Sequence, residues 1–356
     1  MNHEFMRALE QIEREKGIDK EILLEAIEAA LISAYRRHFG SAQNVRVLID
    51  RSTGEVKVYS QRTVVSNPED PRLQISLEEA HKVDPSLREG DVIETEVTPK
   101  EFGRIAAQTA KQVVVQRIRE AERGLIYEEF ASREGDIVTG IVHRAEHRNV
   151  YLDLGRTEAV LPPHEQVYRE QYRPNERLKV YITEVRKTTK GPYIVVSRTH
   201  PGLLKRLFEL EVPEIHDGVV EIKAIAREPG SRSKVAVFSR DENVDPVGAC
   251  VGPRGIRVQA IVNELRGEKL DIVRWDPDPE KFVANALSPA RVVGVQICEE
   301  TKVARVTVPE YQLSLAIGRE GQNARLAAKL TGYKVDIKGE NEAAAEADDG
   351  GAATRR

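Results

Sequence analysis

The sequence predicts a multidomain α+β protein, for three reasons. Apolar spacings typical of amphipathic helices alternate with strand-like segments over residues 1–132. Five short strand-like segments separated by turn residues follow in residues 133–200. Residues 201–276 and 277–339 then repeat one unit, and such a repeat indicates a single supersecondary unit used twice. We therefore expect an N-terminal α+β domain, a β-barrel, two copies of one α+β unit and a disordered tail, 340–356, rich in Ala, Glu, Asp and Gly.

The N-terminal domain is expected to begin with two amphipathic helices. The first runs over residues 2–16 and ends at Gly17. The second starts from the cap Asp19 and carries apolar residues at helical spacing, which predicts one buried stripe. It ends in a basic turn, residues 36–38, with Gly40 as its C-cap, as the helix dipole favours.

Strands and two further helices should complete this domain. Ser76 with Glu79 three residues later is a capping box, which predicts the start of a short helix. A long helix is expected from about Lys100 to Phe130, where Glu and Arg alternate along the later turns. The expected strands span residues 45–50, 55–65 and 91–97.

Residues 133–200 change to short β segments with turns at regular spacing. Five such strands in a segment this short predict a small closed barrel of the OB type. The expected strands span residues 135–142, 149–154, 159–161, 178–185 and 193–197.

The second barrel strand carries a candidate RNA contact. Val150, Leu152 and Leu154 alternate with polar residues and should point inward. Tyr151 then points outward, on the face where such barrels stack bases. Arg148, just upstream, is placed to meet a phosphate or to stack its guanidinium plane on a base. Alternatively, Tyr151 only covers the flank of the barrel.

The repeated unit contains a Gly-x-x-Gly turn followed by a helix. One copy reads Val251-Gly252-Pro253-Arg254-Gly255-Ile256 and the other Ile317-Gly318-Arg319-Glu320-Gly321-Gln322. Each copy is followed by a strand that starts with Asp-Ile, at Asp271 and at Asp336. The expected elements are 202–211, 218–226, 234–239, 246–251, 256–266 and 269–275 in the first unit, and 278–287, 292–298, 302–308, 311–317, 322–331 and 333–338 in the second.

This unit resembles a KH module, whose Gly-x-x-Gly loop clamps the backbone of about four nucleotides of single-stranded RNA. Glycine permits positive φ and close approach to a phosphate, and the next helix directs free N–H groups and its positive end at an anion. Arg254 and Arg319 add charge at the loop tips, whereas Glu320 reduces it and Pro253 removes one backbone donor. The alternative is a pair of ordinary helix-to-helix turns. The candidate residues are Gly252, Pro253, Arg254, Gly255, Arg257, Gly318, Arg319, Glu320, Gly321 and Arg325, of which Arg257 and Arg325 either flank the RNA path or are solvated surface charges.

The net charge of −4 is not evenly distributed along the 356 residues. Residues 1–130 contain 19 Lys and Arg against 24 Asp and Glu, residues 131–339 contain 33 against 29, and residues 340–356 contain 2 against 5. The acidic first domain suits a protein partner better than a phosphate backbone, and the mildly basic middle suits RNA. Aromatic residues are only 5% of the chain, so aromatic platforms should contribute little to RNA binding.

Other features of the composition indicate a cytoplasmic protein that is not an enzyme. Cys250 and Cys298, in different units, argue for a reducing compartment, and each is expected to pack in a core. The N-terminus lacks the apolar stretch of a signal peptide, and no run is long enough to span a membrane. Motifs for phosphate-loop, zinc-protease and serine-hydrolase chemistry are missing, and the eight histidines do not cluster. We therefore expect no catalytic residue, metal or cofactor.

The order of modules resembles the NusA family of bacterial transcription elongation, termination and antitermination factors, over residues 1–339. An acidic N-terminal α+β domain, an S1-type barrel and two KH units follow one another in that family. The stretches that carry the resemblance are residues 102–112, 221–230, 245–250, 314–318 and 322–327.

The resemblance implies that residues 1–132 bind RNA polymerase and that the barrel and two type II KH units hold nascent single-stranded RNA. It also implies roles in pausing, hairpin-dependent termination and, with other Nus factors, antitermination. We expect a monomer that does not bind membranes. Two departures stand out: Arg148 occupies a position where S1-type barrels usually carry a second aromatic residue, and the acidic C-terminal repeats of some members are absent, with any function tied to them.

Two other functions fit some of the same modules. KH and S1 modules also occur in ribonucleases, but residues 1–130 show no paired carboxylates or metal ligands for such an enzyme. A ribosome-assembly or translation factor would bind structured RNA without polymerase. An RNA turnover assay tests the ribonuclease. Co-purification with polymerase or with ribosomal subunits separates a polymerase-bound factor from a ribosome-assembly or translation factor.

Overall fold

The computed structural model describes residues 3–39 and 44–342, which divide into two units with the boundary between Ile126 and Tyr127. The boundary falls within the long helix α4 (Phe102–Ala131). The expected C-cap Gly40 and residues 343–356 of the expected disordered tail lie outside the described residues. Residues 340–342 take a helical conformation, so the prediction of disorder is wrong for them.

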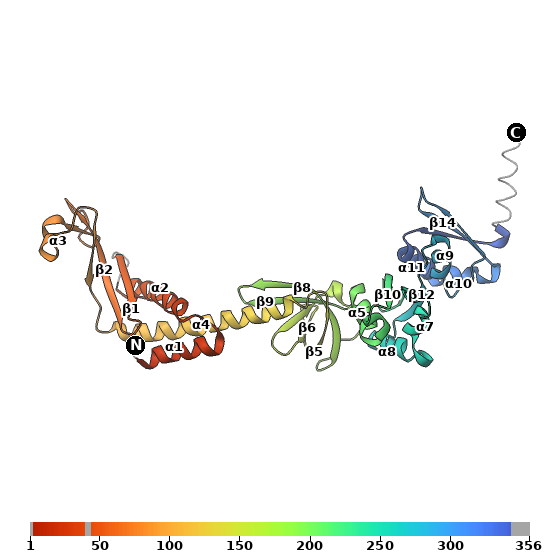
Figure 1. Ribbon diagram of the computed structural model, residues 1–356, viewed down its shortest axis with the longest axis horizontal. Coiled ribbons are helices and arrows are strands. Elements are labelled where there is room, and N and C mark those ends of the chain that lie inside the picture. The colour runs from red at the N-terminus through yellow and green to blue at the C-terminus, as the bar shows by residue number, and fades with distance from the viewer. Residues whose placement is uncertain (1–2, 40–43, 343–356) are drawn as a thin grey trace, which may run out of the picture. The chain divides into compact units, whose positions relative to one another are not determined.

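In the first unit, helices pack on a sheet as the apolar spacing predicts (Figure 1). Helices α1 (His3–Lys16) and α2 (Lys20–Phe39) and the start of α4 share one core with the sheet. The sheet contains β1 (Asn44–Ile49), β2 (Val56–Val65), β3 (Gln74–Ser76) and β4 (Val92–Glu96), with β2 bonded to the other three strands. Its core includes Leu24, Ile27, Leu31, Val47, Phe102 and Ala106.

The predicted N-cap at Ser76 is confirmed by one of the two hydrogen bonds of a capping box. Ser76 Oγ accepts a hydrogen bond of 3.3 Å from the backbone N–H of Glu79, where α3 (Leu77–Val83) begins. Strand β3, directly before that cap, was not predicted, because three residues are too few to show an alternating pattern.

The second unit begins with the expected barrel. Its five strands are β5 (Ile137–Glu146), β6 (Asn149–Asp153), β7 (Glu158–Leu161), β8 (Arg177–Thr188) and β9 (Gly191–Ser197). They close in the order β5-β6-β7-β9-β8, with β7 and β9 parallel and the other pairs antiparallel. Val150 and Leu152 are buried inside, as predicted, whereas Leu154 is half-buried.

Both repeat units have the predicted order of elements. The first contains α5 (Pro201–Glu211), β10 (Val220–Glu228), β11 (Arg232–Ser239), α7 (Pro246–Val251), α8 (Ile256–Glu264) and β12 (Lys269–Arg274). A single helical turn, α6 (Pro213–His216), was not predicted. The second contains α9 (Pro279–Ala286), β13 (Gly294–Cys298), β14 (Val303–Val308), α10 (Leu313–Ile317), α11 (Gln322–Thr331) and β15 (Lys334–Gly339). In each sheet the first two strands are antiparallel and the last two are parallel.

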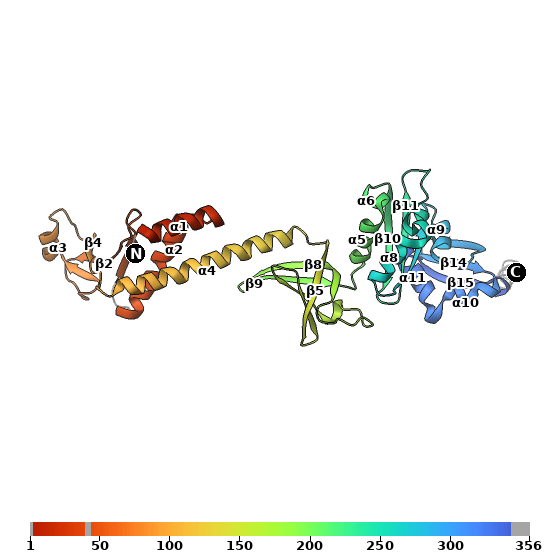
Figure 2. The same ribbon diagram turned by 90° about the horizontal axis from the view of Figure 1, so that it is seen from below.

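The two repeat units share one core, because helices α9 and α11 lie between their sheets (Figures 1 and 2). One hydrophobic cluster contains Ala226, Ala236 and Val273 of the first repeat unit's sheet together with Val283 of α9 and Leu326 of α11. The first sheet is therefore buried on both faces, with its own helices on the opposite side. Such stacking makes the two repeat units one packed body.

The stack ends at the second sheet because its outer face is polar. Lys234 pairs with Asp271 in the first repeat unit, and Arg305 pairs with Asp336 at the same positions of the second repeat unit. The covered face of the first sheet carries the small and apolar residues Ala224, Ala226, Ala236 and Val273. The equivalent positions of the second sheet, on its outer face, carry Gly294, Gln296, Thr307 and Lys338. A polar outer face is what a terminal repeat needs to remain in water.

Candidate nucleic-acid interface

The two Gly-x-x-Gly loops have nearly the same backbone. The first glycine has φ 74° and ψ 174° at Gly252, and φ 76° and ψ 171° at Gly318. In each loop the third residue is also left-handed, with φ 53° at Arg254 and 54° at Glu320. The last glycine donates a 3.1 Å hydrogen bond to the carbonyl of the first. Because two unrelated turns would not converge on these angles, the loops are two copies of one device.

The first glycine of each loop is required by space as well as by φ. A Cβ on Gly252 would lie 2.6 Å from Arg257 Cγ, and one on Gly318 would lie 2.8 Å from both the Cβ and the backbone N of Asn323. A Cβ on Gly321 would meet no atom within 4 Å. The loop therefore folds tightly against the helix that follows it, so a ligand in front can come close to its backbone.

Arg257 lies beneath the first loop. Its Nη1 donates to Glu214 Oε2 at 2.9 Å and to the carbonyl of Ala249 at 2.6 Å. Its side chain thus holds the loop to the preceding helix, and it is not a freely solvated charge.

Asn323 takes the corresponding place beneath the second loop. Its Nδ2 donates to the carbonyls of Leu287 and Ala316, both at 3.0 Å. Its Oδ1 is buried and has no hydrogen-bond partner among the described residues. An amide can replace the arginine there because both side chains bond the carbonyls of the preceding helical turn.

The loop tips project side chains into solvent. Pro253 and Arg254 are exposed, and the side chains of Arg319 and Glu320 are 93% and 84% exposed. Arg319 Nε lies 3.8 Å from Glu320 Oε1, a contact too exposed to hold the arginine in place. The tip arginines are therefore available to an incoming anion.

Arg325, expected either to flank the RNA path or to be a solvated charge, instead joins the two repeat units. Its Nε and Nη2 donate to both carboxylate oxygens of Glu228, at 2.6 and 3.1 Å. This hydrogen bonding keeps the pKa of Glu228 below its usual value. Gln322, directly after the loop, also donates to Glu228 and to Ser231 Oγ. These contacts fix the second loop against the turn between β10 and β11.

Tyr151 on the barrel is covered by Arg144 and not by Arg148. The Arg144 guanidinium lies 4.2 Å from the centre of the Tyr151 ring, and its Nη1 donates to Glu158 Oε1 at 3.0 Å. Arg148 is exposed with φ 67°, and its carbonyl accepts a hydrogen bond from Gln166. The outermost flat surface on this face is therefore the Arg144 guanidinium, which sequence reasoning missed. A bulge between Val142 and Arg144 shifts the β5–β6 register and pairs Arg144 with Tyr151.

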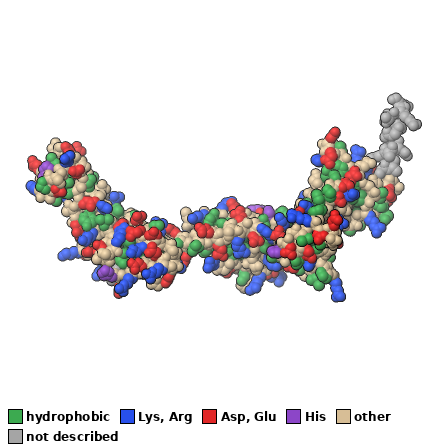
Figure 3. Space-filling view, in the orientation of Figure 1, with side chains coloured by type: hydrophobic (Ala, Val, Ile, Leu, Met, Phe, Trp, Pro, Cys, Tyr) green, Lys and Arg blue, Asp and Glu red, His purple; other side chains and the backbone are tan. Residues whose placement is uncertain are grey.

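Charges of both signs are interspersed on the face of the molecule in Figure 3. Neither sign of charge therefore dominates this face. Cys250 is buried, and burial raises the pKa of its thiol to about 12. Cys298 is exposed on β13, so the prediction that both cysteines pack in cores is wrong for Cys298.

No helix within residues 3–39 and 44–342 is long and apolar enough to cross a membrane. The same residues contain no cluster of three or more His, Cys, Asp or Glu side chains suited to a metal ion.

Four known domain families match the chain in sequence. The NusA N-terminal domain matches residues 4–124 and the S1 RNA binding domain matches residues 132–197. The NusA-like first KH domain matches residues 198–275 and the NusA-like second KH domain matches residues 279–345.

Curated relatives match nearly the whole chain. Proteins named transcription termination/antitermination protein NusA from Halalkalibacterium halodurans and Bacillus subtilis are each 64% identical over 343 residues, which cover 96% of this chain and 90% and 92% of theirs. The protein of that name from Thermus thermophilus is 47% identical, over 95% of this chain and 90% of its own. A solution structure of the N-terminal domain of NusA from B. subtilis covers 35% of this chain and 99% of its own, with 61% identity and a TM-score of 0.32.

Proposed function

The chain belongs to the NusA family of transcription termination/antitermination proteins, and we propose that it binds RNA polymerase through residues 1–132 while the barrel and repeat units hold nascent RNA. One observation carries the RNA part: the two Gly-x-x-Gly loops share one backbone geometry and both open toward solvent. The acidic charge of residues 1–130 favours a protein partner for the first domain. Anchoring on polymerase would keep weak RNA contacts at high effective concentration.

Each loop would hold the sugar-phosphate backbone of a single strand. The glycines let a phosphate approach the main chain, and the helices α8 and α11 begin directly behind the loops with no side-chain cap on their first N–H groups. Arg254 and Arg319 would pair with phosphates. Pro253 and Glu320 would line the same path, and Arg257 and Arg325 would hold the loops in place.

On the barrel, we propose that RNA bases stack over the Arg144–Tyr151 pair, with Arg148 meeting a phosphate nearby. A guanidinium plane held on an aromatic ring offers a flat cationic surface to a base. Since a hydrogen bond to Glu158 holds Arg144 in place, this surface is formed before RNA arrives.

We propose functional domains at residues 1–132, 133–200, 201–276 and 277–339. Their shared cores and short connections support a continuous RNA-binding surface on the last three. The protein would act as a monomer in the cytoplasm, where bacterial transcripts emerge, without an enzymatic activity or cofactor of its own. Pausing, hairpin-dependent termination and, with other Nus factors, antitermination would follow from holding the transcript beside polymerase.

The test is a pause and termination assay with purified bacterial polymerase. A variant in which Pro253, Arg254, Arg319 and Glu320 are all replaced by Asp places paired acids in both loops. Asp tolerates the left-handed conformation that Arg254 and Glu320 adopt, so the loops should keep their shape. A control variant, Lys205→Asp with Lys281→Asp and Gln296→Asp, makes the same change in net charge at exposed sites outside the loops.

We expect the wild type and the control to shift pausing, and the loop variant to bind polymerase without that shift. If wild-type protein leaves pausing and termination unchanged, the proposal is wrong and ribosomal subunits become the partner to test. If the loop variant works as well as wild type, the loops are ordinary turns.

A further inference from the structure

One cleft in the second unit is lined by the barrel and by both repeat units. Its volume is about 490 Å³, and it contains the second Gly-x-x-Gly loop from Gly318 to Glu320. The first repeat unit contributes the turn between β10 and β11 and Lys269, and the barrel contributes Arg169. An RNA strand held by the second loop would thus have one barrel residue, Arg169, within the same cleft.

The cations in this cleft are not equally available. Arg325 is bonded to Glu228, and Arg232 is bonded to Asp271 at 2.6 and 2.9 Å. By contrast, Arg169 and Lys269 form no ion pair with any described residue. Together with Arg319 they give the cleft three cations that are free to meet a polyanion.

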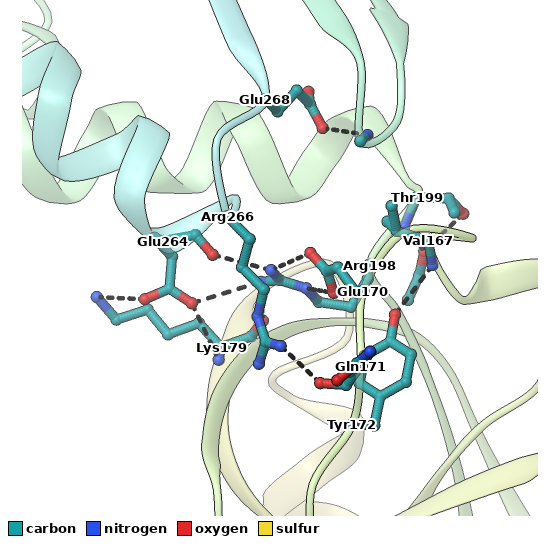
Figure 4. A network of polar contacts seen from close by, with 12 residues as sticks. Val167, Glu170, Gln171, Tyr172, Lys179, Arg198, Thr199, Glu264, Arg266 and Glu268 are labelled. Atoms are coloured by element: carbon teal, nitrogen blue, oxygen red, sulfur yellow. Dashed lines mark hydrogen bonds and ion pairs between the residues drawn. The ribbon is translucent and has the colours of Figure 1, made fainter.

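The barrel loop that carries Arg169 is held rigidly at both ends. On one side Val167 is buried and packs so closely on Gly230 that a Cβ added to this glycine would clash with the Val167 side chain. On the other side Glu170 accepts hydrogen bonds of 3.0 and 2.5 Å from the fully buried Arg198 (Figure 4). Tyr172 Oη accepts a hydrogen bond from the backbone N–H of Val167, which closes the loop.

The same network joins the loop to the first repeat unit (Figure 4). Arg198 also donates to the carbonyl of Glu264 at 2.9 Å, and Arg266 donates to the carbonyl of Gln171 at 2.6 Å. Burial raises the pKa of Tyr172, consistent with a closed interface. The position of the loop beside the cleft is therefore fixed by buried contacts, and ordering it on binding costs little entropy.

Between these two anchors, Tyr168 and Arg169 are the side chains left outside. Tyr168 is fully exposed, at 101% of its reference area. A rigid loop that presents an unburied aromatic ring beside an unpaired guanidinium offers stacking for a base and a partner for a phosphate, which is how proteins hold single strands without reading sequence.

We propose that the barrel completes the RNA site of the second repeat unit, with Arg169 pairing with a phosphate and Tyr168 stacking on a base next to the nucleotides held by residues 318–321. The ligand is single-stranded RNA, and the inference rests on the proposed function of the loops. It adds a contact from the barrel to a site that the loop alone would form.

The test measures affinity for single-stranded RNA oligonucleotides of increasing length with the full chain. Two clamps of about four nucleotides each account for about eight, so the added contact should appear between about eight and twelve nucleotides. The variants are Tyr168→Ala and Arg169→Gln. Matched controls are Tyr193→Ala, a partly exposed tyrosine on β9, and Arg173→Gln, an exposed arginine in the same barrel loop that does not line the cleft.

We expect Tyr168→Ala to lose about tenfold in affinity for the longer oligonucleotides and little for the shorter ones. Arg169→Gln should reduce the dependence of log affinity on log salt by about 0.7, the contribution of one phosphate on a single strand. A photoactivatable uridine in the longer oligonucleotide should cross-link to the peptide that contains Tyr168. Unchanged melting temperatures would show that both variants fold.

This inference would be overturned if Tyr168→Ala and Arg169→Gln both bound RNA oligonucleotides of every length as tightly as wild type, with no cross-link. If the Asp-substituted loop variant still loses RNA in that case, the proposed function stands and only the barrel contact is wrong. If neither the wild type nor any variant binds RNA, the proposed function itself fails. If Tyr168→Ala keeps RNA but loses polymerase, the loop is a protein contact and the inference is wrong.

Discussion

Replacing the two glycines of the second loop by alanine, one at a time, should have very different effects. Gly318→Ala places a Cβ 2.8 Å from the backbone N of Asn323, an atom that cannot move without shifting helix α11. Gly321→Ala places a Cβ in open space. Both positions have positive φ, 76° and 73°, so both variants also strain the backbone.

The expected magnitudes follow from these differences. Gly321→Ala should cost only the strain of a left-handed residue, about 1–2 kcal/mol. Gly318 occupies a region of φ and ψ that is almost confined to glycine, so an alanine there costs about 1–3 kcal/mol of backbone strain. The overpacking of its Cβ against Asn323 costs about 1–3 kcal/mol more. With a shift of about 2–4 °C per kcal/mol for a body of this size, Gly318→Ala should lower Tm by about 4–24 °C, against about 2–8 °C for Gly321→Ala.

Differential scanning calorimetry of the full chain measures both values, and RNA affinity reports whether the loop still works. Gly321→Ala should keep most of the RNA affinity, and Gly318→Ala should lose it together with stability. The same contrast should hold between Gly252→Ala and Gly255→Ala in the first loop. Equal loss of Tm for Gly318→Ala and Gly321→Ala would show that the close packing of the loop on α11 is not present in solution.

Three further predictions concern the contacts around the RNA site. Arg198→Met should lower stability by about 3–5 kcal/mol, because it leaves the carboxylate of Glu170 buried without its partner; denaturant unfolding checks this, and a loss below 1 kcal/mol would contradict it. Arg144→Ala should weaken RNA binding about tenfold, and adding Tyr151→Ala should weaken it little further if the two act as one stacking surface; additive losses in a double-mutant cycle would count against that surface. Acid should loosen the link between the repeat units, because hydrogen bonding to Arg325 lowers the pKa of Glu228 from its usual value of 4.5. The folded state then binds fewer protons than the unfolded state. The stabilisation from this pair is therefore complete above pH 4.5 and is lost as pH falls through the lowered pKa. The Tm difference between wild type and Glu228→Gln should therefore be constant at neutral pH and shrink below pH 4.5, and a difference unchanged down to pH 3 would refute the role of this pair.

Local signals were enough to predict most elements. The apolar stripe of α2, the N-cap at Ser76 and the alternation in β6 each depend on neighbours within a few residues, so the elements follow from the sequence. The helix α11 spans the residues expected, because a glycine loop starts it and Gly332 ends it. The repeat of the Gly-x-x-Gly loop likewise pointed to the two candidate sites.

The partners of individual charged residues could not be predicted in this way. Arg325 meets Glu228 and Lys234 meets the carbonyl of Ser288 only because one repeat unit packs on the other. Arg144, not Arg148, covers Tyr151 because a bulge shifts the register of β5. In each case the two groups are distant in sequence or displaced by one residue, and no local pattern specifies such a meeting.

The sequence by itself determined the modules, their order and the two loops, because helix caps, strand alternation and glycine conformations act over short stretches of chain. Only the tertiary structure decided which arginines remain free for RNA and that Arg169 of the barrel lines the cleft of the second loop. Ion pairs and stacking depend on distances of a few ångströms between side chains from different elements. Those distances are set by the packing of whole sheets and helices, which no single segment encodes.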